Sequence, residues 1–232
     1  MNFPDGGMAV RVQWHGHACF RLTTAAGLVI VTDPFDESVG YLLPRGAADV
    51  VTVSHEHFDH NHVAAVGGRP LVLKGAGVHS LAPLGPEKSK GATIRGVASF
   101  HDSQQGRQRG PNTIFVFDLD GLRVVHLGDL GHQLTAQQVA ELGEADLLLV
   151  PVGGTYTLDG AGAAKVVEAL RPALVIPMHY RTDALSFPLA PVDDFLRAVR
   201  GRVERSTHTT VELEPQDLGR GLEPRILVLQ YQ

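Results

Sequence analysis

The sequence of 232 residues has little of several features that define common classes of protein. With one cysteine, Cys19, it cannot form a disulfide within the chain, and we interpret that residue as a small buried hydrophobe. No apolar run approaches the roughly 18 residues that a membrane-spanning helix needs. Residues 1–10 lack the apolar core of a signal peptide. We therefore expect a cytoplasmic protein that does not insert into a membrane.

Positive charge is also scarce. Lysine and arginine together number 20, against 25 aspartate and glutamate residues, which gives a formal net charge of -5. Because no basic stretch is present, binding to long nucleic acids is not expected. Hydrophobic residues make up 44% of the chain, which is ordinary for a globular protein. The expected partner is a small-molecule substrate, and the sequence leaves the oligomeric state open.

Metal-ligand side chains, by contrast, are concentrated in one short segment after an apolar run at 49–53, which we predict to be a buried strand. Imidazole and carboxylate groups are ligands of zinc and neighbouring transition metals. The segment contains four of them: His55, His57, Asp59 and His60. The first two are two residues apart in extended chain and point to the same side, so they can chelate one ion. The last two come as the chain turns into a predicted short helix at 61–66 and can reach a second ion.

The same pattern recurs along the chain, because further apolar runs end at His101, Asp129 and His179. If these strand ends converge, five histidines and two aspartates surround one cleft. The predicted ligands are His55, His57 and His101 for one ion, and Asp59, His60 and His179 for the other, with Asp129 bridging. Ions in such pairs lie roughly 3.5–4 Å apart. Two divalent ions with these carboxylates and a bridging hydroxide keep about one positive charge, which favours an anionic substrate.

The rest of the chain predicts one domain over residues 1–232, with a flexible tail at 1–7. Strands are predicted at 9–14, 18–23, 28–32, 71–74, 93–100, 113–118, 122–127, 145–150, 173–176 and 226–229. Helices are predicted at 135–142, 161–170 and 192–199. An early part rich in strands and a later part that alternates strand and helix suggest sheets with helices packed outside them.

The ligand order, from the His55–His60 segment through His101 and Asp129 to His179, resembles the metallo-β-lactamase superfamily of hydrolases. Finer motifs resemble its branch of small metal-dependent hydrolases related to the L-ascorbate-6-phosphate lactonases. They are Trp14-His15-Gly16-His17, Thr32-Asp33-Pro34, the segment 126–132 and Ile176-Pro177-Met178-His179-Tyr180. The resemblance implies an α/β (α+β) protein with an αββα four-layer sandwich, in which two mixed β-sheets are flanked by helices.

The implied chemistry is metal-assisted hydrolysis. A water held between two ions has its pKa lowered, and the resulting hydroxide attacks a carbonyl or phosphorus centre while Asp59 orients it and moves its proton. Zinc is the default metal, although manganese or iron also suits these ligands. We expect a binuclear hydrolase of a small, anionic ester, lactone or phosphoester. The alternatives are a phosphodiesterase or nuclease of the same fold, and a metal-binding sensor protein without turnover.

Several residues near the predicted ligands are weaker candidates. Substrate contacts are hypothesised for four residues close to ligand-bearing strand ends: Arg109, Asn112, Tyr156 and Tyr180. Arg109, like Arg107, could equally be a solvated loop charge. A supporting role around the ligands is hypothesised for Asp33, His17 and His132. An Asp-Pro turn explains Asp33 nearly as well, and a purely structural role is the simpler interpretation of the two histidines.

Overall fold

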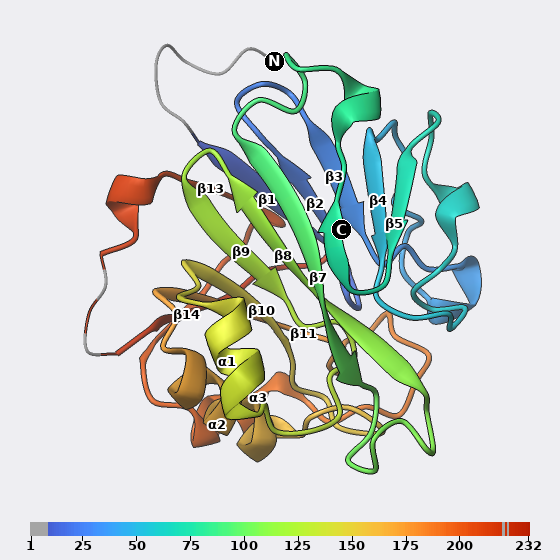
Figure 1. Ribbon diagram of the computed structural model, residues 1–232. Coiled ribbons are helices and arrows are strands. Elements are labelled where there is room, and N and C mark those ends of the chain that lie inside the picture. Colours follow the sequence, from blue (N-terminus) through green and yellow to red (C-terminus); the bar gives the residue numbers. More distant parts are fainter. Residues whose placement is uncertain (1–8, 220, 222) are drawn as a thin grey trace.

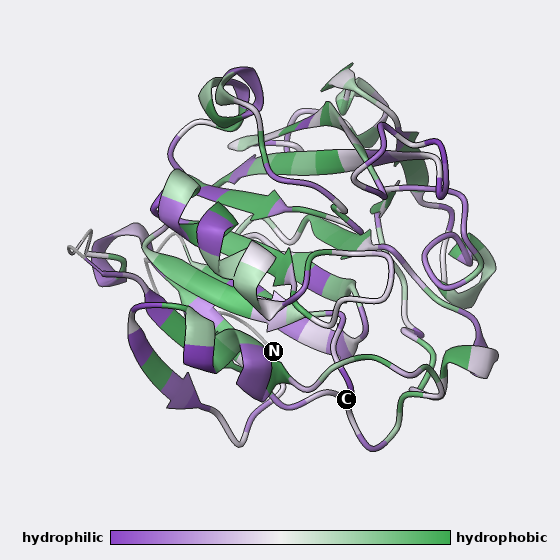
Figure 2. Cartoon of the chain, turned by 90° about the horizontal axis from the view of Figure 1, so that it is seen from below, coloured by the Kyte–Doolittle hydropathy of each residue, from purple (hydrophilic) through white to green (hydrophobic). Residues whose placement is uncertain are grey.

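Two mixed β-sheets pack face to face in the computed structural model, which describes residues 9–219, 221 and 223–232 (Figure 1). The predicted tail at 1–7 lies outside these residues. Apolar side chains from both sheets fill the space between them, and the hydropathy colouring shows this concentration of hydrophobic residues along the strands (Figure 2). Trp14 and Phe20 of one sheet and Phe115 and Phe117 of the other are fully buried there. Burial of this apolar surface is the main driving force for the fold.

The first sheet has six strands in the order β13-β1-β2-β3-β4-β5. Their bounds are β1 Val10–Gly16, β2 Cys19–Thr23, β3 Val29–Thr32, β4 Val50–Val53, β5 Leu71–Lys74 and β13 Thr210–Leu213. The pairs β13–β1, β1–β2 and β2–β3 are antiparallel, whereas the pairs β3–β4 and β4–β5 are parallel. β4 ends at Val53, just before the ligand-rich segment that begins at His55.

The second sheet has eight strands in the order β12-β14-β11-β10-β9-β8-β7-β6. Their bounds are β6 Gly77–His79, β7 Ala92–Phe100, β8 Pro111–Leu119, β9 Leu122–His126, β10 Leu147–Pro151, β11 Leu174–Met178, β12 Arg202–Arg205 and β14 Arg225–Val228. The strands β9, β10 and β11 run parallel to one another. Because β8 is antiparallel to both β7 and β9, β7 runs in the same direction as these three. The carboxyl ends of β7, β9, β10 and β11 therefore lie along one edge of the sheet.

The outer layers of the sandwich differ from each other. The helices α1 Ala136–Leu142, α2 Gly160–Leu170 and α3 Val192–Ala198 cover the eight-stranded sheet (Figure 1). The six-stranded sheet is covered by loops and the 3-10 turns η1 Glu37–Val39 and η2 Val63–Ala65, whose side chains pack on Val31 and Val51. Two further 3-10 turns are η3 Ala82–Leu84 and η4 Pro215–Asp217. With 11 residues, α2 is the longest helix in the described part of the chain, so no helix there could span a membrane.

Most of the predicted elements are confirmed to within two residues at each end. Thr135 begins α1 with a capping box that also uses Gln138, as its position before the apolar pattern predicts. The predicted helix at 61–66 is wrong in type, because only the single 3-10 turn η2 forms there before Val66 returns to extended backbone. Three strands, β6, β12 and β13, were not predicted. The extent of the domain, residues 1–232, stays a prediction.

Replacement of Leu22 by alanine tests the contribution of the core between the sheets. Leu22 on β2 is fully buried, so Leu22→Ala should lower the free energy of unfolding by about 2–5 kcal/mol. For a chain of this size the melting temperature should fall by roughly 5–15 °C in a calorimetric scan. Leu42 is 68% exposed, and the matched control Leu42→Ala should change stability by no more than about 0.5 kcal/mol. Equal effects of the two substitutions would contradict this assignment of the core.

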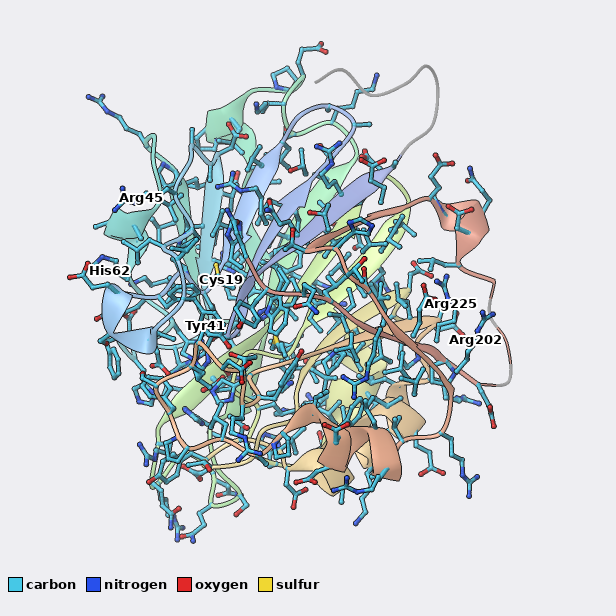
Figure 3. All side chains as sticks on the ribbon, turned by 180° about the vertical axis from the view of Figure 1, so that it is seen from behind. Cys19, Tyr41, Arg45, His62, Arg202 and Arg225 are labelled. Carbon is cyan, nitrogen blue, oxygen red and sulfur yellow. The ribbon has the colours of Figure 1, made fainter. Side chains whose placement is uncertain are left out.

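The buried position of Cys19 leads to a second prediction. Cys19 has no exposed surface and lies among the strands (Figure 3), and burial, with the nearby Asp33 carboxylate, raises the pKa of its thiol well above the ordinary value. Since the thiolate is the reactive form, a chromogenic disulfide reagent at neutral pH should not label the native protein. One thiol per chain should react after unfolding in guanidinium. Rapid labelling of native protein would show that Cys19 is accessible.

Candidate metal centre

The predicted ligands come together where the two sheets meet at one edge. His101, Asp129 and His179 follow the carboxyl ends of β7, β9 and β11, which share an edge of the eight-stranded sheet. The segment from His55 to His60 follows β4 of the six-stranded sheet. Potential ligand atoms gather here in three groups: two contain the predicted ligands, and the third, Asp33, His55 and His60, shares one histidine with each of them.

The first group contains His55, His57 and His101. One potential ligand atom from each of these residues lies within 4.8 Å of the others. The ring centroid of His57 is 4.5 Å from that of His55 and 5.1 Å from that of His101. This is the trio that the sequence assigns to one ion.

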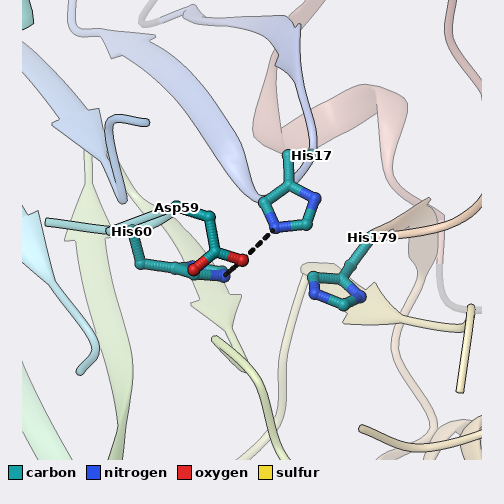
Figure 4. A group of neighbouring side chains, drawn as sticks. All are labelled: His17, Asp59, His60 and His179. Carbon is teal, nitrogen blue, oxygen red and sulfur yellow. Dashed lines mark hydrogen bonds and ion pairs between the residues drawn. The ribbon is translucent and has the colours of Figure 1, made fainter. Parts of the chain in front are cut away.

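The second group contains His17, Asp59, His60 and His179 (Figure 4). The Nε2 atom of His17 donates a hydrogen bond to Asp59 Oδ2 at 3.1 Å, and His60 Nε2 lies 3.5 Å from the same oxygen. The ring centroids of His17 and His179 are 4.2 Å apart. His17 was hypothesised only to support the ligands. Its fully buried side chain lies directly beside the predicted ligands Asp59, His60 and His179.

Asp129 lies between the two groups. Its Oδ2 atom is 3.2 Å from the Nε2 atoms of both His60 and His101, and 3.3 Å from that of His179. The Nε2 atom of His55 is 3.8 Å away. The carboxylate therefore contacts histidines of both groups, as a bridging ligand would have to do.

The unpaired atoms of the cluster fit a cation. The buried atoms His55 Nε2, His60 Nε2 and Asp129 Oδ1 have no hydrogen-bond partner. Such groups are unfavourable to bury unless they are hydrogen-bonded or coordinate a metal. Burial lowers the pKa of His55 to about 3, which keeps its imidazole neutral and able to ligate. A divalent ion is the chemical group that this set of imidazoles and carboxylates suits.

The carboxylates of the cluster remain ionised although they are buried. Burial alone would raise the pKa of Asp129, but the imidazoles of His179 and His60 hold it well below the ordinary value. The pKa of Asp59 is lowered in the same way by His60 and by the hydrogen bond from His17. Conversely, Asp129 and Asp59 raise the pKa of His60 against the effect of burial. Metal binding at such a centre displaces protons from its ligands.

Hydrogen bonds behind the ligands fix the orientation of the imidazoles. Asp33 is fully buried, and its Oδ2 atom accepts hydrogen bonds from His60 Nδ1 at 3.0 Å and from Ser54 Oγ at 2.5 Å. Ser54 Oγ in turn accepts a hydrogen bond from His55 Nδ1 at 2.9 Å. His101 Nδ1 donates to the carbonyl oxygen of Tyr156 at 3.0 Å. In each case the Nδ1 proton is held outward from the centre, which directs Nε2 toward it.

Two of the residues hypothesised to contact substrate, Asn112 and Tyr180, are buried in the protein interior. Asn112 is 2% exposed; its amide nitrogen donates to Ser99 and to the carbonyl of Leu127, and its oxygen accepts a hydrogen bond from Asp129 N at 3.0 Å. Asn112 therefore fixes the position of the backbone at Asp129. Tyr180 is 5% exposed and packs against Trp14, with ring centroids 5.3 Å apart. The left-handed backbone of His179, with φ of 51°, turns the next side chain into the core.

The other three candidates lie near the cluster without joining it. His132 has a structural role: its Nε2 atom accepts a hydrogen bond from Phe100 N, and its Nδ1 atom donates to the carbonyl of Gln133. Arg109 and Tyr156 lie together, with the guanidinium carbon 3.1 Å from the centroid of the tyrosine ring. Tyr156 is 57% exposed and is tied to His101 through its carbonyl, so this pair borders the first group of ligands.

Known proteins are similar to this chain in sequence and in fold. A family model described as a beta-lactamase superfamily domain matches residues 11–179. A UPF0173 metal-dependent hydrolase from Thermoplasma acidophilum is 32% identical over 191 residues, which cover 75% of this chain and 84% of that protein. Another, from Methanoculleus marisnigri, is 32% identical over 227 residues, with coverages of 88% and 93%. A crystal structure from Thermotoga maritima, named as a candidate Zn-dependent hydrolase of the metallo-beta-lactamase superfamily, is 40% identical, with a TM-score of 0.75 and coverages of 96% and 100%.

This chain therefore belongs to the metallo-β-lactamase superfamily, as its ligand order predicted. Within that superfamily it is one of the metal-dependent hydrolases. The predicted sandwich of two mixed sheets is likewise confirmed by the architecture and by the structural match.

The role of Asp33 can be tested through metal affinity. The Asp33→Asn variant removes the charge that accepts hydrogen bonds from His60 and Ser54, so metal binding should weaken by roughly 10–100-fold. Competition with a chromogenic chelator measures this change. The exposed Asp183 provides a control, because Asp183→Asn should leave the affinity unchanged. If Asp33→Asn left the metal affinity unchanged, the role of Asp33 would be limited to the Asp-Pro turn.

Proposed function

We propose that the protein is a binuclear hydrolase of a small, anionic ester, lactone or phosphoester. The observation that carries this proposal is the position of Asp129, whose carboxylate oxygen contacts His101 of one ligand group and His60 and His179 of the other. A mononuclear structural site needs only four ligands and would not require a second, adjacent group.

The two groups would hold one ion each. The expected ligands are His55, His57 and His101 for the first ion, and Asp59, His60 and His179 for the second, with Asp129 shared between them. Zinc is the metal we expect, and the mixture of imidazole and carboxylate also suits manganese or iron. Bound divalent ions supply Lewis acidity and lower the pKa of water.

Asp59 is the residue we assign to proton transfer. Its side chain is 15% exposed, compared with 3% for Asp129, so it is the more accessible carboxylate of the cluster. His17 holds Asp59 through the hydrogen bond to Oδ2 and leaves Oδ1 free of that contact. A carboxylate held in this way can orient a water molecule, accept its proton and return it to the leaving group.

Metal stoichiometry tests the two-ion arrangement. Elemental analysis of the metal-replete protein should give two ions per chain. His57→Ala removes a ligand from the first group only and should lower the content toward one, whereas Asp129→Ala should reduce both. The exposed His208 serves as the control, because His208→Ala should retain both ions. One ion per wild-type chain would contradict the proposal.

The activity of the metal-loaded protein tests the hydrolase assignment. A panel of small esters, lactones, phosphomonoesters and phosphodiesters should include at least one class that is hydrolysed. Asp59→Asn should reduce kcat by about 100-fold or more, since general acid–base groups contribute 10²–10⁴-fold. Hydrolysis of phosphodiesters alone would favour the phosphodiesterase alternative. If the protein with both ions bound hydrolysed none of these classes of compound, the hydrolase proposal would be wrong.

A further inference from the structure

An apolar pair borders the second group of ligands. Phe58 stands between His57 and Asp59 in the chain and is 52% exposed, although most large apolar side chains are buried. Its ring packs edge-on against Phe187, with centroids 6.0 Å apart. The Phe187 ring is in turn 5.7 Å from that of His17. Exposed apolar surface directly beside metal ligands is available to the apolar part of a ligand.

The cationic pair, which consists of the Arg109 guanidinium and the Tyr156 ring, borders the first group of ligands. The guanidinium carbon of Arg109 lies over the ring of Tyr156, 3.1 Å from its centroid, and the carbonyl of Tyr156 accepts a hydrogen bond from His101. Stacking leaves the N–H edge of a guanidinium available for a carboxylate or phosphate, which it can bind with two parallel hydrogen bonds. No acidic side chain in the described ranges forms an ion pair with Arg109.

The loop that carries Arg109 is preorganised. Asp102, the residue after the ligand His101, accepts hydrogen bonds from four backbone N–H groups of this loop at 2.7–2.9 Å. One of the four is the N–H of Arg109 itself. A loop fixed by one buried carboxylate presents its arginine in a defined place, so less entropy is lost when an anion binds.

The loop that carries Tyr156 is held as firmly. Thr155 and Tyr156 are consecutive non-glycine residues with positive φ, at 48° and 80°. Backbone of this kind is unfavourable for residues other than glycine and is found mainly at functional sites, where the surrounding structure holds it in place. Thr155 Oγ1 also donates a hydrogen bond to the carbonyl of Pro188 at 3.3 Å, which links this loop to the one that carries Phe187. The cationic and apolar pairs thus lie on connected loops around one ligand cluster.

We propose that the substrate is amphiphilic, with an anionic group that binds Arg109 and an alkyl or aryl group that packs against Phe58 and Phe187. This inference rests on the proposed hydrolase function and narrows its substrate class. The bond to be broken would lie between the two recognition points, over the metal ligands. Recognition of this kind selects against small anions without an apolar part, since they leave Phe58 and Phe187 exposed to water.

Binding of alkylphosphonates to the metal-loaded protein tests this inference without a need for turnover. Isothermal titration calorimetry with methyl-, butyl- and octylphosphonate should show affinity that rises about two- to four-fold per methylene. Octylphosphonate should thus bind at least about 15-fold more tightly than butylphosphonate. In Phe58→Ala and Phe187→Ala this ratio should fall at least five-fold, and Phe58→Leu should keep most of it. The exposed Leu42→Ala is the control and should behave as wild type.

The same titrations separate the anionic contact from the apolar one. Arg109→Ala should weaken all three phosphonates by a similar factor of about ten or more and leave the chain-length ratio intact. Arg107→Ala, in the same loop, should have no effect. Equal affinities for butyl- and octylphosphonate in the wild type would overturn the inference, as would an unchanged ratio in both phenylalanine variants. The hydrolase proposal would survive that result, whereas a panel without turnover would overturn the hydrolase proposal itself.

Discussion

One buried carboxylate, that of Asp33, ties the two halves of the metal centre together. It accepts a hydrogen bond from His60 of one group and, through the hydroxyl of Ser54, holds His55 of the other. Asp33 has no exposed surface, so its charge depends on these donors for stabilisation. The orientation of both imidazoles and the burial of Asp33 are therefore mutually dependent, and neither can be altered alone without leaving an unsatisfied group.

The sheet topology places these side chains within reach of one another. Since β7, β9 and β11 run in the same direction, the residues that follow them emerge along a single edge. These strands are buried by packing against the opposite sheet, so the short turns that carry the ligands are anchored directly to rigid elements. Substrate recognition, by contrast, is assigned to loops, which fits the general division between a stable scaffold and a variable rim.

The residue pattern was sufficient to predict most of the strands and the side chains that gather at their ends, whereas the binding of metal by each of these side chains stays a prediction. Apolar runs that end in histidine or aspartate mark strand ends, and each of the seven predicted ligands lies in the cluster. His17 was harder to assign, because its position depends on a left-handed backbone, φ 50°, in a two-residue turn that no local pattern announces. Tyr180 was misplaced for a related reason, the left-handed conformation of His179. The strand β12 escaped prediction because all four of its residues are exposed, so no apolar alternation exists.

The contact between His17 and His179 joins parts of the chain that are far apart in sequence. His179 N donates a hydrogen bond to the carbonyl of His17, and both side chains face the same Asp59–His60 pair. Closing such a long loop carries an entropic cost that is met only when the flanking strands are already paired. A nascent chain therefore cannot possess this centre until β11 has been synthesised and docked. An ion held by the second ligand group, as proposed above, could therefore be captured only after these late steps of folding.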